Sequence, residues 1–282
     1  MSTFLSRLKK DLEKIKNPQK AKLLQRFFKT GKGEYGEGDI FIGLTVPQER
    51  EIAKKYYSLD LHDLKELIES KIHEERMICL FILMHKYKTT NHKKIIFHFY
   101  IKNMKHINNW DLVDLSAPSI AGEHLLALEK TCAEQSRVSD DARQFYLIQK
   151  LVSALLSKNR RQTGAQSIFN SSENELSRAI QVLSVLAKSE SVWERRIAVL
   201  ATFRFIKEKK FDESLKLAKI LLKDKHDLIH KAVGWMLREI GKRDLEMEMK
   251  FLNKYYQKMP RTMLRYAIER FPEVTRQHYL SK

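Results

Sequence analysis

Three segments in the second half of the sequence repeat one another at a regular interval. They read SVWERRIAVLATFRFI, DLIHKAVGWMLREI and RTMLRYAIERF, and they align so that Arg196, Lys231 and Arg265 correspond. The intervals are 35 residues (231 − 196) and 34 residues (265 − 231), the length of one pair of helices with its turns. One such pair cannot bury its apolar face alone, so the repeat predicts helix pairs stacked on one another.

The remaining sequence agrees with an entirely helical chain. Apolar residues recur at helical spacing almost throughout, without the alternation that marks strands. Pro18 and Pro47 stand where the first turns of helices are expected, and HEERMICLFILMHKYK resembles an earlier copy of the repeat. We therefore predict an all-α fold, an α-solenoid of HEAT-like helical repeats with a concave basic face, forming a single domain over residues 1–282.

Two stretches interrupt this pattern. GKGEYGEGD, residues 31–39, holds four of the nine glycines and is predicted to be a loop. It is not a typical phosphate-binding loop, because it lacks the GK[ST] ending and no strand precedes it. Residues 131–190 break the repeat and form a longer variable segment, within which ELSRAIQVLSVLAK, residues 175–188, resumes the helical pattern.

The charge of the chain indicates an anionic partner. Lys and Arg total 53 against 35 acidic residues, which gives a formal net charge of +18. Such an excess favours nucleic acid ahead of membrane, although simple solubility is an alternative. Two cysteines offer no disulfide framework, and we find no signal peptide or apolar run long enough to span a bilayer. We expect a cytoplasmic protein, nucleoid-associated if prokaryotic.

The aligned cations of the repeats suggest how such a partner could bind. Stacked repeats place equivalent positions in a row, so Arg196, Lys231 and Arg265 should form a basic stripe along one face. A stripe of this kind could follow a nucleic-acid backbone. The alternative is that each cation is an ordinary solvated helix residue.

Each of the three tryptophans has a charged residue on the same helical face. The pairs are Trp110 with Asp114, Trp193 with Arg196, and Trp235 with Lys231. A tryptophan alone is more often a core residue, but three of three beside charges in a basic chain favour a functional role. The pattern indicates an aromatic cleft with one carboxylate and phosphate-binding cations.

Other clusters of polar residues indicate no second kind of site. His226 and His230 in HDLIH have metal-ligand spacing, but an aspartate replaces the glutamate of H-E-x-x-H and no third ligand is evident. Adjacent Glu74 and Glu75 could imitate paired carboxylates, yet neighbouring helix residues point apart, and we expect them on a solvated face. We predict neither a metal nor a cofactor.

Four motifs together resemble a known family. NNWDLVD, SVWERRIAVL and HKAVGWMLRE, with FIGLTVPQER upstream, are similar to the AlkD-type DNA alkylation repair glycosylases, and the resemblance runs from about residue 4 to residue 271. It implies HEAT-like repeats that wrap duplex DNA and remove N3- and N7-alkylated purines without flipping the base. The stretch between NNWDLVD and SVWERRIAVL is longer than in compact members of the family.

The resemblance also implies roles for individual residues. Asp114 corresponds to the catalytic aspartate of the W-D-x-V-D stretch, and Trp110 and Trp235 correspond to the aromatic residues that flank the deoxyribose of the lesion. Arg196 matches the arginine that holds the backbone there. Phe27 falls where relatives have an aromatic residue near the duplex. Trp193, Lys231 and Arg265 come from the repeat and tryptophan patterns and complete the expected DNA-binding set.

Together with the resemblance, these patterns predict a monomeric DNA glycosylase that acts on double-stranded DNA containing alkylated purines. Two alternatives remain open. The first is a non-catalytic HEAT-type nucleic-acid binder, and the second is a protein-interaction scaffold whose basic face meets an acidic partner. Asp114 distinguishes the enzyme from a binder, because a pure binder gains nothing from a carboxylate inside a phosphate-binding face.

Overall fold

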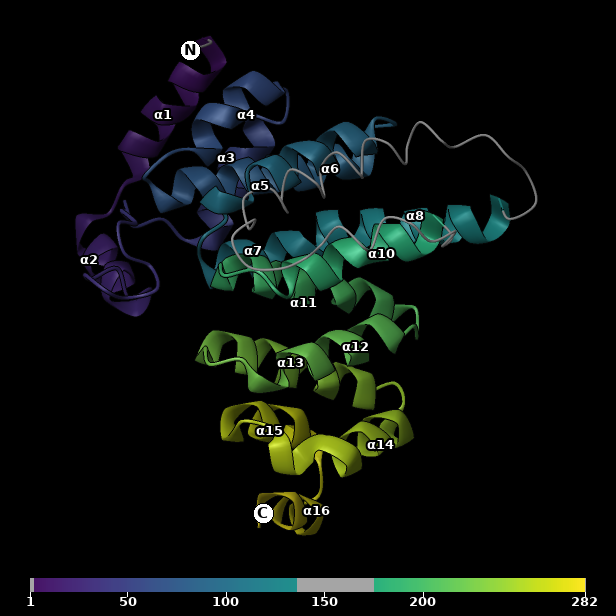
Figure 1. Cartoon of the computed structure of the whole chain (residues 1–282). Coiled ribbons are helices and arrows are strands. Elements are labelled where there is room, and N and C mark those ends of the chain that lie inside the picture. Colours follow the sequence, from purple (N-terminus) through teal and green to yellow (C-terminus); the bar gives the residue numbers. More distant parts are fainter. Residues whose placement is uncertain (1–2, 136–174, 282) are drawn as a thin grey trace. The chain divides into compact units, whose positions relative to one another are not determined.

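The computed structural model describes residues 3–135 and 175–281, and these form helices joined by turns and loops (Figure 1). The only β-pairing among the described residues is an isolated parallel bridge between Ile40 and Ile72, so the all-α prediction is confirmed. The chain comprises two compact units, residues 1–121 and 122–282. A continuous solenoid over residues 1–282 stays a prediction, and residues 136–174 of the predicted variable segment lie outside the described residues.

Unit 1 is built around one buried helix, α5. Its helices are α1 (Thr3–Ile15), α2 (Pro18–Phe27), α3 (Val46–Lys55), α4 (Leu61–Ile68), α5 (His73–Thr89), α6 (Lys93–Lys102) and α7 (Trp110–Ala117), with a 3-10 turn at Met104–His106 and a π-helical turn at Pro118–Gly122. Helix α5 packs against α3, α4, α6 and α7. Every residue from 73 to 83 is buried, as expected of a helix covered on all sides.

The predicted helix starts in unit 1 are confirmed by their caps. Asn17 precedes α2, and its side chain accepts a 3.0 Å hydrogen bond from the Lys20 N–H. Thr45 precedes α3 and forms a reciprocal capping box with Gln48. Pro18 and Pro47 occupy the first turns, where a missing N–H leaves no helical hydrogen bond unmade.

The predicted glycine-rich loop connects α2 to α3. The Gly31 and Gly33 N–H groups donate to the loop's own Glu34 and Glu37 carboxylates, both at 2.8 Å. These amide groups are therefore not available to cradle a phosphate. Further along, Gly43 has φ +91°, and a Cβ there would lie 2.1 Å from the Asn17 carbonyl oxygen, so only glycine fits this position.

Unit 2 shows the repeat that the sequence predicts. Its helices are α8 (Glu123–Gln135), α10 (Glu175–Leu186), α11 (Val192–Lys207), α12 (Asp212–Ile220), α13 (Asp227–Gly241), α14 (Leu245–Tyr255), α15 (Arg261–Ala267) and α16 (Glu273–Leu280), with 3-10 turns after α12, α14 and α15. Helices α11, α13 and α15 start 35 and 34 residues apart (227 − 192 and 261 − 227). Helix α13 packs against both α11 and α15, so the predicted period is the spacing of these helix pairs.

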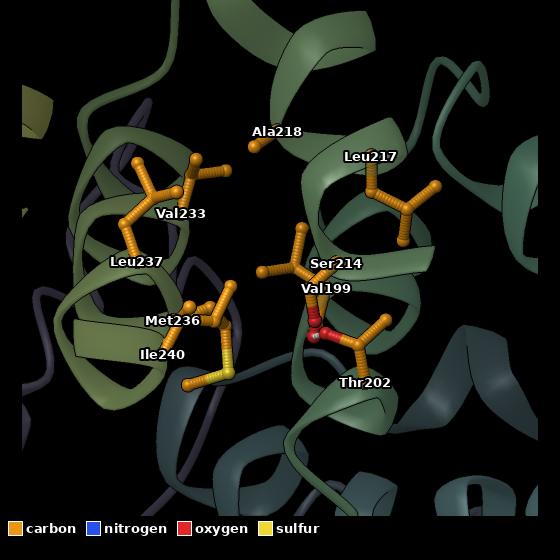
Figure 2. Close-up of a pocket in the computed structure, with 9 residues that line it drawn as sticks. All are labelled: Val199, Thr202, Ser214, Leu217, Ala218, Val233, Met236, Leu237 and Ile240. Atoms are coloured by element: carbon orange, nitrogen blue, oxygen red, sulfur yellow. Dashed lines mark hydrogen bonds between the residues drawn. The ribbon is translucent and has the colours of Figure 1, made fainter. Parts of the chain in front are cut away.

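Close backbone contact holds two successive pairs of unit 2 together. A Cβ at Gly234 of α13 would lie 2.4 Å from the Met263 carbonyl oxygen and 2.5 Å from Cβ of Tyr266 on α15. The absent side chain therefore permits the two helices to approach. Between α11, α12 and α13 a small apolar gap remains, lined by residues that include Val199, Leu217 and Met236 (Figure 2). It has no room for a water molecule, which makes it a packing feature of the core.

Replacement of Gly43 by alanine tests how tightly the loop is seated. Gly43→Ala combines an unfavourable positive φ with a clash against backbone, so it should destabilise the protein by several kcal/mol. Gly33→Ala is the matched control, since Gly33 has φ +79° but nothing within 4 Å of the added Cβ, and it should cost about 1 kcal/mol. Urea unfolding measures both, and equal losses would contradict the close approach to Asn17.

Candidate active site

The helix that carries the predicted catalytic aspartate begins within the NNWDLVD segment. Asn109 precedes α7, and its Oδ1 accepts a 2.9 Å hydrogen bond from the Trp110 N–H. Trp110 is the first residue of α7, and Asp114 lies one turn later on the same face. Both residues are half-buried, so each retains contact with solvent.

Asp114 lies close enough to the buried Tyr100 for its charge to affect that residue. Tyr100 is fully buried and its hydroxyl shares a 3.0 Å hydrogen bond with Ser116. Burial raises the pKa of Tyr100 strongly, and the nearby charge of Asp114 raises it further. A carboxylate in such a position interacts with neighbouring charges more strongly than it would in water.

Trp110 rests on a bed of aromatic rings. Its indole stacks on Phe28, with centroids 5.3 Å apart and planes 16° apart, and Phe27 meets it edge-on at 6.1 Å. Phe28 stacks in turn on Phe41 at 4.9 Å, and Phe41 stacks on His73 at 4.4 Å. Phe27 is 64% exposed. The predicted aromatic pair Phe27 and Trp110 is therefore in direct contact, with Phe27 on the outside.

Beneath these rings lies a buried cluster of charged side chains. His73 places Nδ1 3.1 Å from Asp39 Oδ2 and Nε2 2.8 Å from Asp111 Oδ2. Arg76 donates to Asp39 Oδ1 at 2.6 Å, and the Asn109 amide donates to Asp39 Oδ2 at 3.1 Å. Both residues that flank Trp110 in the sequence are thus tied into one cluster.

The ionisation of this cluster follows from its geometry. Burial opposes the charged form of His73, but the charge and hydrogen bond of Asp111, with that of Asp39, outweigh burial and raise the pKa of His73 to about 9. Burial likewise opposes ionisation of Asp39, but hydrogen bonds from His73 and the charge of Arg76 hold the pKa of Asp39 below its ordinary value. At neutral pH the imidazole is therefore a cation between two carboxylates.

Glu74 and Glu75 are not on a solvated face, and that prediction is wrong. Both are buried on α5. Glu74 is stabilised there by hydrogen bonds that it accepts from the backbone N–H groups of residues 42–44 at 2.8–3.3 Å. Glu75 lies 3.9 Å from the ammonium of Lys9. Nearby Glu49 is buried as well, and burial followed by the charge of Glu74 raises the pKa of Glu49 to about 8.

No pattern in the sequence points directly to the charged cluster. Its members come from the glycine-rich loop, from the start of α5 and from the start of α7, and no local spacing links these segments. The nearest hint is the NNWDLVD segment, where polar residues stand on both sides of a tryptophan. Such residues at a helix start are more often simple caps, and Asn109 is indeed one.

In unit 2 the predicted backbone-binding arginine is buried. Arg196 is 5% exposed, and its guanidinium donates to the carbonyl oxygen of Leu228 at the start of α13. Its neighbour Arg195 instead pairs with Asp224 at 2.7 Å. Trp193 is also buried, with 9% exposed. The contacts of Arg195 and Arg196 join α11 to the segment at the start of α13, so both arginines have a packing role.

The other two cations of the predicted stripe are more accessible. Lys231 on α13 is half-buried and pairs with Asp227 at 2.6 Å, whereas Arg265 on α15 is exposed. The three aligned cations therefore lie on consecutive packed helices but differ in exposure, from the buried Arg196 to the open Arg265. Their contact with nucleic acid stays a prediction.

Trp235 is held in place by a salt-bridge group on its own helix. Its indole Nε1 donates to Glu239 at 3.3 Å, and its ring lies 5.8 Å from that of Phe203. Glu239 also binds Lys242 at 2.5 Å and Arg243 at 3.0 Å. These cations outweigh burial and lower the pKa of Glu239, so the group that orients the half-buried indole stays ionised.

The structure therefore groups the predicted site residues in two sets. Unit 1 brings together Phe27, Trp110 and the helix that carries Asp114. Unit 2 carries the other predicted residues on adjacent helices, namely Trp193, Arg196, Lys231, Trp235 and Arg265.

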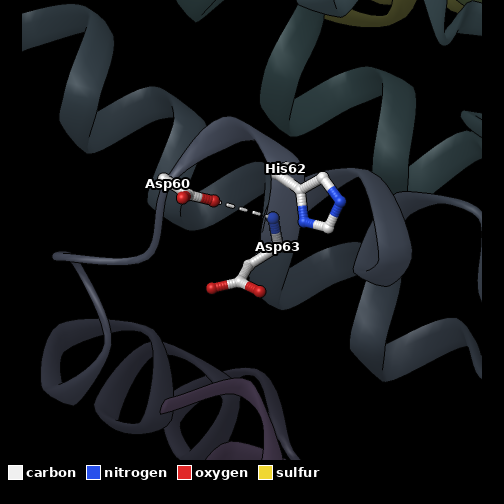
Figure 3. A group of neighbouring side chains, drawn as sticks. All are labelled: Asp60, His62 and Asp63. Atoms are coloured by element: carbon white, nitrogen blue, oxygen red, sulfur yellow. Dashed lines mark hydrogen bonds between the residues drawn. The ribbon is translucent and has the colours of Figure 1, made fainter. Parts of the chain in front are cut away.

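Both histidines of HDLIH form hydrogen bonds with backbone groups. His226 Nδ1 accepts from the Leu228 N–H at 3.1 Å, and His230 Nε2 bonds to the Asp224 carbonyl oxygen. Among the described residues one group has ligand atoms close enough for a metal, namely Asp60, His62 and Asp63 (Figure 3). Asp60 caps α4 by accepting from the Asp63 N–H at 2.9 Å, which accounts for this group.

The described parts of the chain are all-helical, and successive helix pairs pack on one another in unit 2. A family model described as DNA alkylation repair enzyme matches residues 8–143 and 132–271. The chain belongs to this family, and the predicted resemblance is confirmed. No protein with curated function matches the sequence.

Solved structures that are similar to this one include the following two. The first is a predicted DNA alkylation repair enzyme from Enterococcus faecalis, with 13% identity and a TM-score of 0.57, covering 92% of this chain and 97% of that one. The second is smu.31 from Streptococcus mutans UA159, with 15% identity and a TM-score of 0.47, covering 90% and 98%. The first likeness supports the helical fold alone.

No helix in the described parts of the chain combines the length and apolar character needed to cross a membrane.

The buried histidine makes stability depend on pH in a specific direction. The folded state binds the His73 proton more tightly than the unfolded chain, whose ordinary pKa is 6.5. Its contribution is therefore complete below pH 6.5 and is lost as pH rises through about 9, with a limit of about 3 kcal/mol. The difference in unfolding free energy between the parent and His73→Gln should shrink across this window. A difference that stays constant would mean that His73 is neutral in the fold.

Proposed function

We propose that this protein is a DNA glycosylase that hydrolyses the N-glycosidic bond of cationic N3- or N7-alkylated purines in duplex DNA. The observation that carries the proposal is the start of α7, where Trp110 and the half-buried Asp114 share one face in a chain of the DNA alkylation repair enzyme family. Asp114 would stabilise the positive charge that develops on the sugar and position the attacking water.

A single carboxylate suffices for this reaction. Alkylation at N3 or N7 makes the base cationic, so it leaves as a neutral molecule without a proton from an acid. Bond breaking leaves positive charge on the deoxyribose, and a fixed carboxylate beside that charge lowers the barrier. The Trp110 indole, held against Phe28, offers a rigid aromatic face to the same cation.

The DNA-binding residues of the proposal come from both units. Phe27 would contact the duplex beside Trp110, and Trp235 would flank the sugar from α13. Arg196 would hold the backbone at the lesion from a position fixed by its bond to Leu228. Double-stranded DNA is the proposed partner, since a net charge of +18 favours a polyanion.

The role of Asp114 is tested by Asp114→Asn. The amide keeps the shape of the side chain but removes its charge, so we expect excision to fall by about two orders of magnitude or more, with duplex affinity and thermal stability close to those of the parent. Release of methylated purines under single-turnover conditions measures the effect. Near-normal excision by this variant would remove Asp114 from the mechanism, as a non-catalytic binder requires.

The basic stripe is tested by the salt dependence of binding. Arg265→Ala and Lys231→Ala should each weaken duplex binding and reduce the salt slope by about one counterion if the side chain contacts one phosphate. Arg196→Ala should do so too, but with loss of stability because the residue is buried. Lys250→Ala, an exposed cation on α14, is the control. If all the slopes equal that of the parent, the stripe does not meet phosphate.

The choice of lesion follows from the absence of a proposed proton donor. The protein should release 3-methyladenine and 7-methylguanine, with little or no uracil or hypoxanthine from otherwise identical duplexes, because neutral bases are poor leaving groups. Enzyme excess must be matched and spontaneous depurination subtracted. Efficient uracil excision that Asp114→Asn abolishes would show that the site activates neutral leaving groups, and would overturn this mechanism.

A further inference from the structure

The charged cluster in unit 1 holds both neighbours of Trp110. Asn109 caps α7 and donates to Asp39, and Asp111 binds His73 at 2.8 Å from the first turn of the helix. Asp111 is three residues before Asp114, so its side chain lies one helical turn away. The start of α7 is therefore fixed on two sides of the tryptophan by groups that belong to other segments.

One imidazole makes the connection between these segments. His73 is 2% exposed and bridges Asp39 of the loop to Asp111 of α7 through its two ring nitrogens. Only a ring that carries a proton on each nitrogen can donate to both carboxylates. The same proton balances the charges, since His73 and Arg76 then face two carboxylates and the cluster is neutral.

We propose that His73 is a positioning residue of the active site, which in its doubly protonated form fixes the start of α7 through Asp111, so that Trp110 and Asp114 are held in place. This inference rests on the proposed glycosylase function. His73 itself lies beneath the aromatic rings and acts through Asp111 rather than on the substrate.

Loss of the proton has two consequences at the site. One of the two carboxylates loses its hydrogen bond from His73. Asp39 keeps those from Arg76 and Asn109, so loss of the bond to Asp111 is the one that loosens the first turn of α7. The cluster also gains a net negative charge close to Asp114. This charge disfavours the proposed substrate, which is a polyanion. A displacement of about 1 Å in a catalytic group can cost up to about 100-fold in rate.

The groups that face His73 determine when this occurs. Asp39 approaches from the loop, Asp111 from α7 and Arg76 from its own helix. The buried Glu49 of α3 also interacts with the charge of His73. Among these groups the charge of Asp111 raises the pKa of His73 most, with burial opposing it. Asp111→Asn should therefore move the loss of the proton to lower pH.

Single-turnover excision of 7-methylguanine provides the first test, between about pH 6 and pH 8.5, where histidines with ordinary pKa values titrate. The parent rate should be nearly flat, because His73 keeps its proton. The Asp111→Asn rate should fall as pH rises, and His73→Gln should be about 10- to 100-fold slower at every pH, with duplex affinity within about twofold of the parent's. His62→Gln, an exposed histidine on α4, is the control and should match the parent.

Tryptophan emission provides a second test that needs no catalysis. A chain with Trp193→Phe and Trp235→Phe retains only Trp110, whose emission reports the start of α7. Its emission should change as pH rises through about 9. Asp111→Asn should move this change to lower pH, and His73→Gln should abolish it.

The outcomes separate the inference from the function on which it rests. If the intact chain excises but the Asp111→Asn rate is flat with pH, or the emission change persists in His73→Gln, the positioning role is wrong and the glycosylase stands. If the intact chain releases no methylated base at any pH, the proposed function fails and this inference fails with it. Altered pH dependence in His62→Gln would also contradict the assignment to His73.

Discussion

The two hydrogen bonds of the His73 imidazole, to Asp39 and to Asp111, are the interaction on which unit 1 depends. They connect a glycine-rich loop, the central helix α5 and the start of α7. Further contacts constrain the backbone around them. Ile40 and Ile72 form a β-bridge beside the histidine, and the Glu74 carboxylate accepts hydrogen bonds from the backbone N–H groups of residues 42–44. A buried charge is costly unless it is paired and hydrogen-bonded, so these groups support one another. The same network supports the aromatic rings beneath Trp110, because His73 stacks on Phe41 and Phe41 stacks on Phe28.

The sequence predicted the parts of this structure that have local causes. Helical periodicity, the helix starts at Pro18 and Pro47, and the 35- and 34-residue intervals follow from neighbouring residues, and the helices bear them out. Trp110 and Asp114 share a face because their spacing requires it. The partners of His73 and Glu74 could not be predicted, because they come from distant segments and depend on how the loop folds back. Glu74 and Glu75 were expected in solvent for that reason, since burial of acids depends on partners that no spacing reveals.

Unit 2 shows how one repeated position can serve different purposes. Arg196, Lys231 and Arg265 align in sequence and lie on consecutive packed helices, yet the first is buried against the Leu228 carbonyl and the last is exposed. The sequence repeat therefore predicts on which helix a cation lies. Whether that cation is exposed depends on its contacts with the neighbouring helix pair. Trp235 is oriented by a hydrogen bond to the ionised Glu239, and Trp110 is oriented by stacking on Phe28. In both units an indole of the proposed site is held by groups that the sequence alone did not single out.

The most direct test of the account is the stoichiometry of the products formed from methylated duplex DNA. Hydrolysis of the N-glycosidic bond leaves one abasic sugar for each purine released. Free methylated purines, quantified by chromatography, and abasic sites, counted with an aldehyde-reactive probe, should therefore appear at the same rate and in equal amounts when the intact chain is added. Disappearance of methylated purines without abasic sites would indicate removal of the alkyl group instead. No change in either product, despite tight binding to the duplex, would identify a binding protein and contradict the proposed chemistry.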